Sequence, residues 1–160
     1  MNDNGFGLWE SRAIITYLVD KYAKTDALYP KDAQKRAAIN QRLQFDMSLY
    51  ASIADYYFEQ MREKKPGNAD KLKKLEGNVE FLNTFLDGQT YVAGNTLSLA
   101  DFSLTPTIST LEALSFDFSK YANVLRWFAH IKTVVPFELN EKSVSVMKER
   151  IKAYNSASSK

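Results

Sequence analysis

The sequence predicts a mainly α-helical fold, and three observations carry that prediction. Apolar residues recur at spacings of three and four over most of the chain, as they do along one face of a helix. The segment after Ser98 is apolar on all sides, which is typical of a helix buried among others. Ser98 is followed three residues later by Asp101, a spacing that predicts a helix N-cap with a reciprocating acid.

The first 24 residues predict a short strand followed by one helix. Asp3, Asn4 and Gly5 form a strong hairpin-turn signal, but only two residues precede it, so we infer an incomplete sheet. Residues 6–9 have the composition of a strand. A helical pattern begins at Ser11, whose hydroxyl we expect to cap the first turn.

Residues 25–32 are polar, contain a proline and show no period, which predicts a linker. Asp32 is expected to cap a helix that runs without interruption from about Ala33 to Lys64. An all-helical domain is therefore predicted over residues 33–154.

Within this predicted domain, later helices are expected to end near Gly88, Leu114 and Pro136. Pro106 falls inside the central helix, where it predicts a kink rather than a break. Residues 155–160 are polar and are expected to form a flexible tail that frays.

Composition argues against several classes of function. Because 21 lysine and arginine residues are balanced by 19 aspartate and glutamate residues, we expect no binding to nucleic acid or to a membrane. The chain has no cysteine, which fits a reducing compartment. His130 is the single histidine, so we expect no metal site. The N-terminus lacks a signal peptide and no apolar run reaches membrane-spanning length, so a cytoplasmic location is the expectation.

Several short segments occur in an informative order. They are residues 8–14, 28–31, 39–47 and 81–86, followed by the Ser98–Asp101 cap. Together these segments resemble the cytosolic glutathione S-transferases, and the insect delta class in particular. Residues 8–14 are similar to the Glu-Ser element that opens the last helix of the family's thioredoxin-like domain, and residues 28–31 are similar to its interdomain linker.

The resemblance implies the fold in more detail. Residues 33–154 would form the all-helical C-terminal domain of a glutathione transferase. Residues 1–24 would be a remnant, a strand and the last helix, of the thioredoxin-like domain that binds glutathione. The implied function is detoxification, in which the glutathione thiolate is conjugated to hydrophobic electrophiles, with glutathione as co-substrate and no other cofactor. A homodimer is the implied assembly.

By motif, Glu10 and Ser11 would hold the γ-glutamyl end of glutathione, and Arg12 would support the same pocket. A hydroxyl and the backbone N–H groups at a helix N-terminus suit a carboxylate, and an acid suits an ammonium group. Without the resemblance, Ser11 is a simple N-cap and the two charged residues are surface groups.

A hydrophobic acceptor pocket is expected along the long helix, where methionine and aromatic side chains share one side and can adapt to varied apolar electrophiles. Its predicted members are Met47, Tyr50, Ala54, Tyr57, Phe58 and Met61. Ordinary core packing is the alternative for each residue taken singly. Arg42 and Asp46, one turn apart, are expected to pair on the helix surface.

Thiolate stabilisation is the chief catalytic device of these enzymes, and in delta-like members an N-terminal serine supplies it. No residue of this chain replaces that serine, so we identify no catalytic residue and expect an N-terminally truncated family member that is inactive as it stands. The alternative from another class is a non-catalytic helical docking module or a carrier of apolar ligands.

Overall fold

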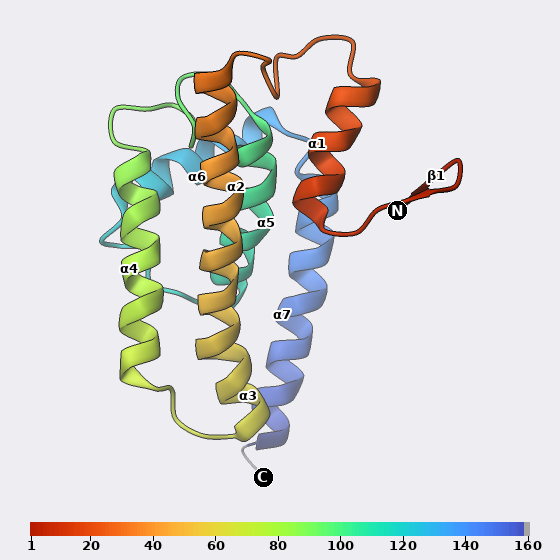
Figure 1. The fold of residues 1–160 in the computed structure, drawn as a ribbon. Coiled ribbons are helices and arrows are strands. Elements are labelled where there is room, and N and C mark those ends of the chain that lie inside the picture. Colours follow the sequence, from red (N-terminus) through yellow and green to blue (C-terminus); the bar gives the residue numbers. More distant parts are fainter. Residues whose placement is uncertain (159–160) are drawn as a thin grey trace.

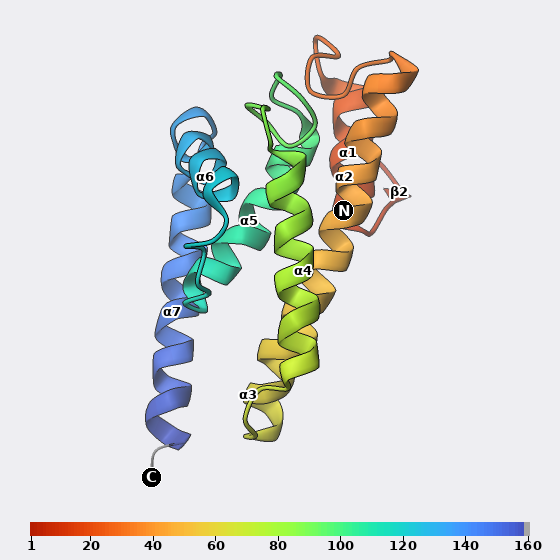
Figure 2. The same cartoon turned by 90° about the vertical axis from the view of Figure 1, so that its left-hand side faces the viewer.

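The computed structural model describes residues 1–158 and confirms the mainly α-helical prediction. In chain order the elements are β1 (Asn2–Asp3), β2 (Phe6–Gly7), α1 (Ser11–Tyr22), α2 (Ala33–Ile53), the π-helical turn η1 (Ala54–Phe58), α3 (Glu59–Glu63), α4 (Ala69–Phe85), α5 (Leu99–Ala113), α6 (Ala122–Val134) and α7 (Glu138–Ser158). The helices α2 and α4 lie side by side with α5 behind them, and α7 runs along the far side of α5 (Figures 1 and 2).

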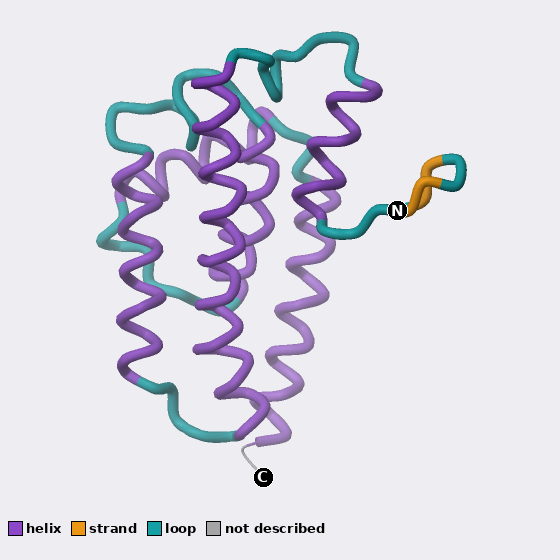
Figure 3. The backbone as a smooth tube through the Cα atoms, in the orientation of Figure 1, coloured by secondary structure: helices purple, strands orange, loops and turns teal. Residues whose placement is uncertain are grey.

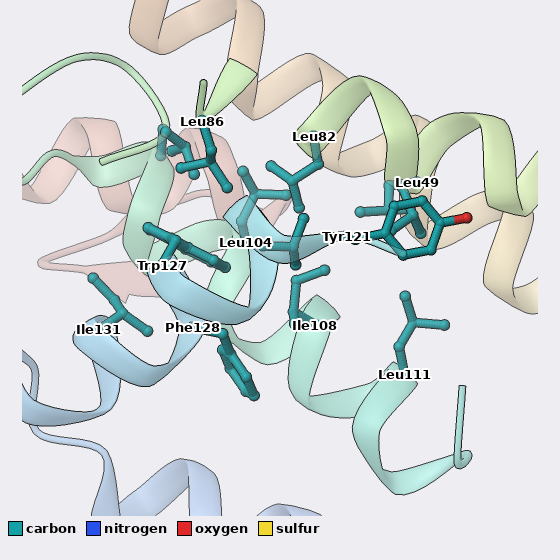
Figure 4. Packing of buried hydrophobic residues seen from close by; sticks show 14 of the residues in the cluster. Leu49, Leu82, Leu86, Leu104, Ile108, Leu111, Tyr121, Trp127, Phe128 and Ile131 are labelled. Carbon is teal, nitrogen blue, oxygen red and sulfur yellow. The ribbon is translucent and has the colours of Figure 1, made fainter. Parts of the chain in front are cut away.

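The core of the bundle surrounds α5, most of whose residues are buried. Trp127 and Ile131 reach it from α6, Leu82 from α4 and Leu49 from α2, and all four are fully buried (Figure 4). Burying such side chains is the main favourable term in folding, at about 1.5–3 kcal/mol for each large apolar residue. The centre of the bundle therefore lies where the all-round apolar segment predicts it.

The start of α5 is fixed by a buried carboxylate. Ser98 occupies the N-cap position, and both its N–H and its hydroxyl donate to Oδ2 of Asp101 at 3.0 Å. The other oxygen of Asp101 accepts from the N–H of Val92 at 3.0 Å and from Nε1 of Trp127 at 2.9 Å. Asp101 thus caps α5 and also joins it to α6 and to the turn before it.

The long helix is unbroken along the chain but not uniform in geometry. It begins after Asp32, whose carboxylate accepts from the N–H of Lys35 at 2.9 Å, and it ends at Lys64, which takes a left-handed conformation with φ 53°. Between Ala54 and Phe58 the backbone forms a π-helical turn, which the sequence pattern did not predict. A π turn holds one more residue than an α turn and shifts the faces of the residues beyond it.

The N-terminal hairpin lies beside α1, on the side of the molecule away from α4 (Figure 3). Asn2 pairs with Gly7 and Asp3 with Phe6, so the predicted turn does close a hairpin, although each strand has only two residues. Asp3 accepts hydrogen bonds from Tyr17, Lys21 and Tyr22, all on α1. The hairpin is therefore attached to α1.

Two sequence predictions need correction here. Ser11 is the first residue of α1 and not its cap, because Glu10 occupies the N-cap position and no side chain caps this helix. At the other end of the chain, α7 continues to Ser158, four residues into the expected tail, while residues 159–160 lie outside the described part of the chain.

Candidate functional site

Glu10 is the N-cap residue of α1 and sets the backbone conformation at the start of this helix. Its backbone has φ 69° and ψ 108°, which is unusual for a residue with a side chain, and such conformations cost on the order of 1–3 kcal/mol and are found mainly at functional sites. The carbonyl of Glu10 accepts from the N–H of Ile14 at 2.9 Å and so starts the helix. The turn leaves the Glu10 and Ser11 side chains exposed at the N-terminus of α1.

Arg12 and Asp46 join α1 to the bundle. The Arg12 guanidinium donates to Oδ2 of Asp46 through Nε at 3.0 Å and through Nη2 at 2.5 Å. Two hydroxyls of α5 complete the shell of Asp46: Ser103 donates to Oδ2 at 2.5 Å and Thr107 to Oδ1 at 2.6 Å. The Asp46 side chain is fully buried, so this carboxylate is held by one cation and two hydroxyls in a low-dielectric site.

The predicted pairing of Arg42 with Asp46 is wrong. Arg42 turns the other way, donates from Nε to the Val92 carbonyl at 2.9 Å, and lies 3.5 Å from the centre of the Phe85 ring. Burial lowers the pKa of its guanidinium. Asp46 pairs instead with Arg12, which lies 34 positions earlier in the chain. Helical spacing predicts only pairs a few residues apart, so it does not reveal this one.

A groove with a volume of about 510 Å³ opens beside Ser11, and we call it the Ser11 groove. Its lining comes from α1, α2 and α5. The residues that line it are Ser11, Arg12, Ile15, Tyr50, Phe102, Ser103, Pro106, Thr107 and Thr110. Two of the three residues predicted to hold glutathione therefore share one groove, whereas Glu10 stands outside this lining.

A second groove of about 400 Å³ lies between the long helix and α7, and we call it the α7 groove. Its lining residues are Tyr50, Phe58, Met61, Thr110, Ser143, Val146, Met147, Arg150 and Ile151. Its walls are mostly aliphatic, thioether and aromatic, a composition suited to apolar ligands. The rings of Tyr50 and Phe58 face each other edge-on with their centroids 6.4 Å apart.

The two grooves meet at one wall, because Tyr50 and Thr110 line both of them. A molecule in the Ser11 groove and another in the α7 groove would therefore touch the same two side chains. Through this shared wall, two of the residues predicted to bind glutathione lie in a groove next to the one that holds three of the six predicted acceptor residues.

The structure separates the six predicted acceptor residues into two groups. Tyr50, Phe58 and Met61 line the α7 groove, whereas Met47, Ala54 and Tyr57 belong to neither groove lining. Tyr57 packs partly buried against the core, and this burial raises the pKa of its phenol. The π turn lies at the point where Phe58 rather than Tyr57 enters the lining, and its extra residue accounts for this one exchange.

Sequence reasoning missed the contributions of α5 and α7 to these grooves. Ser103 and Thr107 stand four residues apart on α5 and both donate to Asp46, but α5 contains three other hydroxyl residues and the sequence does not single these two out. Arg150 belongs to a helix whose narrow apolar stripe gave no sign of a ligand site. Of the helices that the structure describes, none is long and apolar enough to cross a membrane.

Comparison with known proteins places this geometry in a family. Residues 38–133 match the family model for the glutathione S-transferase C-terminal domain. The structure is similar to a delta-class glutathione transferase of Nilaparvata lugens, with a TM-score of 0.91 and 46% identity over 96% of this chain and 73% of that one.

Two glutathione transferases of Bombyx mori are also similar. One has a TM-score of 0.87 and 38% identity, covering 92% of this chain and 70% of that chain. The other, described as unclassified, has a TM-score of 0.90 and 37% identity, covering 96% and 72% respectively. The chain therefore belongs to the glutathione S-transferase family, and its structural relatives include insect enzymes of the delta class.

Proposed function

We propose that this chain binds the γ-glutamyl end of glutathione at Ser11 and takes up apolar electrophiles in the α7 groove, as part of glutathione conjugation in detoxification. The observation that carries the proposal is the shared wall of Tyr50 and Thr110, which sets the two grooves next to each other. Conjugation requires this adjacency, because two reactants held side by side react as if they were one molecule.

Binding of the γ-glutamyl group draws on the N-terminus of α1. The first N–H groups of a helix have no partner within the helix, and the helix dipole favours an anion there. The Ser11 hydroxyl adds a donor for the same carboxylate, and the exposed Glu10 carboxylate suits the ammonium group. Arg12, tied to Asp46, acts by positioning, since it holds this helix end against α5.

Titration of the purified chain with glutathione tests this site. We expect Ser11→Ala to weaken glutathione binding about tenfold, because a hydrogen bond to a charged group is lost. Thr16→Ala is the matched control, since that hydroxyl lies on the same helix but donates to the carbonyl of Ala13 at 2.9 Å. Wild-type affinity in Ser11→Ala, or no glutathione binding by the parent chain, would refute the proposal.

Thiolate activation is assigned to none of the residues described above. We therefore propose that the purified chain conjugates glutathione to chlorodinitrobenzene more slowly than a delta-class relative does. Equal turnover of the purified chain would overturn this part and would require a thiol-activating group within it. We further propose a cytoplasmic homodimer, as is typical of the family, and a solution mass equal to one chain would refute the dimer.

A second candidate function is that of a carrier for apolar ligands, and the mostly apolar lining of the α7 groove favours it. The two candidates differ in their dependence on glutathione. A carrier binds its ligand equally well with and without glutathione and forms no conjugate, which parallel titrations and product analysis would detect.

A further inference from the structure

The mostly apolar α7 groove carries one positive charge in its lining and no negative charge among the described residues. The positive charge is that of Arg150. The ion pairs found among residues 1–158 do not include Arg150, whose side chain is exposed. An unpaired guanidinium beside an apolar surface attracts anions and offers them a planar, bidentate set of donors.

Arg150 lies away from the end of the α7 groove that adjoins the Ser11 groove. Tyr50 and Thr110 mark the end of the groove that adjoins the Ser11 groove. Asn140, near the start of α7, donates to Oγ of Ser109 at 2.6 Å, next to Thr110, and Arg150 lies ten residues further on, about 15 Å along a helix. One turn further on, Tyr154 donates to the backbone carbonyl of Met61, which fixes this part of α7 against α3.

We propose that the acceptors of this chain are apolar electrophiles that carry a carboxylate or sulfonate, and that Arg150 binds this anionic group. The reactive carbon then lies near Tyr50 and Thr110, and the anion lies further along α7, at Arg150. The proposal rests on the proposed function for the identity of the groove, and it deepens that function by naming the charge class of the substrate.

Elementary electrostatics gives the expected selectivity. A neutral acceptor fills the groove through apolar contact alone and leaves Arg150 solvated. An anionic acceptor of the same shape gains an ion pair, and the adjoining apolar wall makes that pair less screened than one in open water. Arg150 therefore discriminates between two ligands that differ only in charge.

A matched pair of fluorescent probes tests the proposal directly. Anilinonaphthalene sulfonate is anionic, and N-phenylnaphthylamine is the same aromatic framework without the sulfonate. We expect Arg150→Gln to weaken sulfonate binding about three- to tenfold, as suits a partly exposed charge-assisted contact. The affinity for N-phenylnaphthylamine should stay unchanged, and Arg150→Lys should restore part of the sulfonate affinity.

Lys148→Gln is the control, because Lys148 is an exposed cation on the same helix that does not line the groove. It should leave the affinity for both probes unchanged. An equal loss of sulfonate binding in Lys148→Gln and Arg150→Gln would overturn the proposal by showing a general charge effect. Loss of both probes in Arg150→Gln, or of neither, would overturn it as well.

The probe titrations are carried out without glutathione, so the two proposals can fail separately. If glutathione does not bind the chain but Arg150→Gln still selects against the sulfonate, the charge preference stands and the conjugation function fails. If glutathione binding depends on Ser11 but the two probes respond alike to Arg150→Gln, the conjugation function stands and the anionic preference fails.

Discussion

The bundle around α5 and the N-terminal piece, residues 2–22, each depend on a buried aspartate, but in different ways. Asp101 accepts four hydrogen bonds from groups inside the bundle, among them Val92 and Trp127. Asp46 instead reaches out of the bundle to Arg12 on α1. All residues of α1 are described and none is fully buried; Ile15 and Val19 pack only partly against the core, so polar contacts carry more of the attachment of α1 than in the bundle. The bundle should unfold as one unit, and α1 should open on its own.

The largest expected effect is at Asp101. Asp101→Ala leaves two backbone N–H groups and the Trp127 indole N–H without a partner in the core, and each buried unsatisfied donor costs about 1–3 kcal/mol. We expect a loss of roughly 3 kcal/mol or more in the free energy of unfolding, measured by urea denaturation.

Asp87→Ala serves as the control for this measurement. Asp87 is exposed and lies outside the core, so its removal should change stability by less than about 0.5 kcal/mol. Similar losses in the two variants would contradict the central role of Asp101.

A smaller and more local effect is expected at Asp46. Asp46→Ala frees Arg12, whose side chain is 21% exposed and can be hydrated, so the global loss should be roughly 1–2 kcal/mol. Amide hydrogen exchange should show a greater loss of protection in α1 than in α5.

Asp20→Ala is the comparison variant, since it breaks the Arg36–Asp20 pair between α2 and α1, a surface ion pair of the kind that contributes little to stability. The contrast between the two regions would be broken if α1 and α5 lost protection to the same degree in Asp46→Ala.

The smallest effect concerns the hairpin. Hydrogen bonds from Lys21, and then from Tyr22 and Tyr17, hold the pKa of Asp3 well below its usual value. Because the folded pKa is lowered, the attachment of the hairpin is fully present above about pH 4 and is lost only as the pH falls through the folded value. The contact between the Phe6 and Tyr17 rings, 5.2 Å apart, should therefore persist from neutral pH down to about pH 3 in nuclear Overhauser measurements.

Asp3→Asn should remove the same ring contact at neutral pH, while urea denaturation gives an unchanged midpoint for the bundle. A parallel shift of that midpoint would show that the hairpin and the bundle unfold together, against the division between the two regions.

Local signals in the sequence were sufficient for the helices. The prediction of a buried helix after Ser98 and of a helix after Asp32 needed only caps and periodicity, which are decided by residues a few positions apart. The polar contacts of the site could not be predicted in this way. Asp46 pairs with Arg12 and not with Arg42 because α1 packs on α5. This packing is decided by residues far apart in the chain.

The prediction of the acceptor residues was only partly right, and the reason for the error is a different one. An unbroken α-helix predicts Tyr57 on the same side as Tyr50, whereas the structure places Phe58 there. The error is one of register: periodicity assumes a constant number of residues per turn, and η1 departs from that number.

The π turn at Ala54–Phe58 also affects how this protein should be compared with its relatives. A turn that absorbs one extra residue lets a helix change its length in sequence without rotating its later turns in space. A relative that lacks one residue here would keep the same groove wall by using an ordinary α turn. If a relative forms an ordinary α turn here, its alignment with this chain needs a one-residue gap, and equivalent wall residues should then be matched by position in space rather than by counting along the helix.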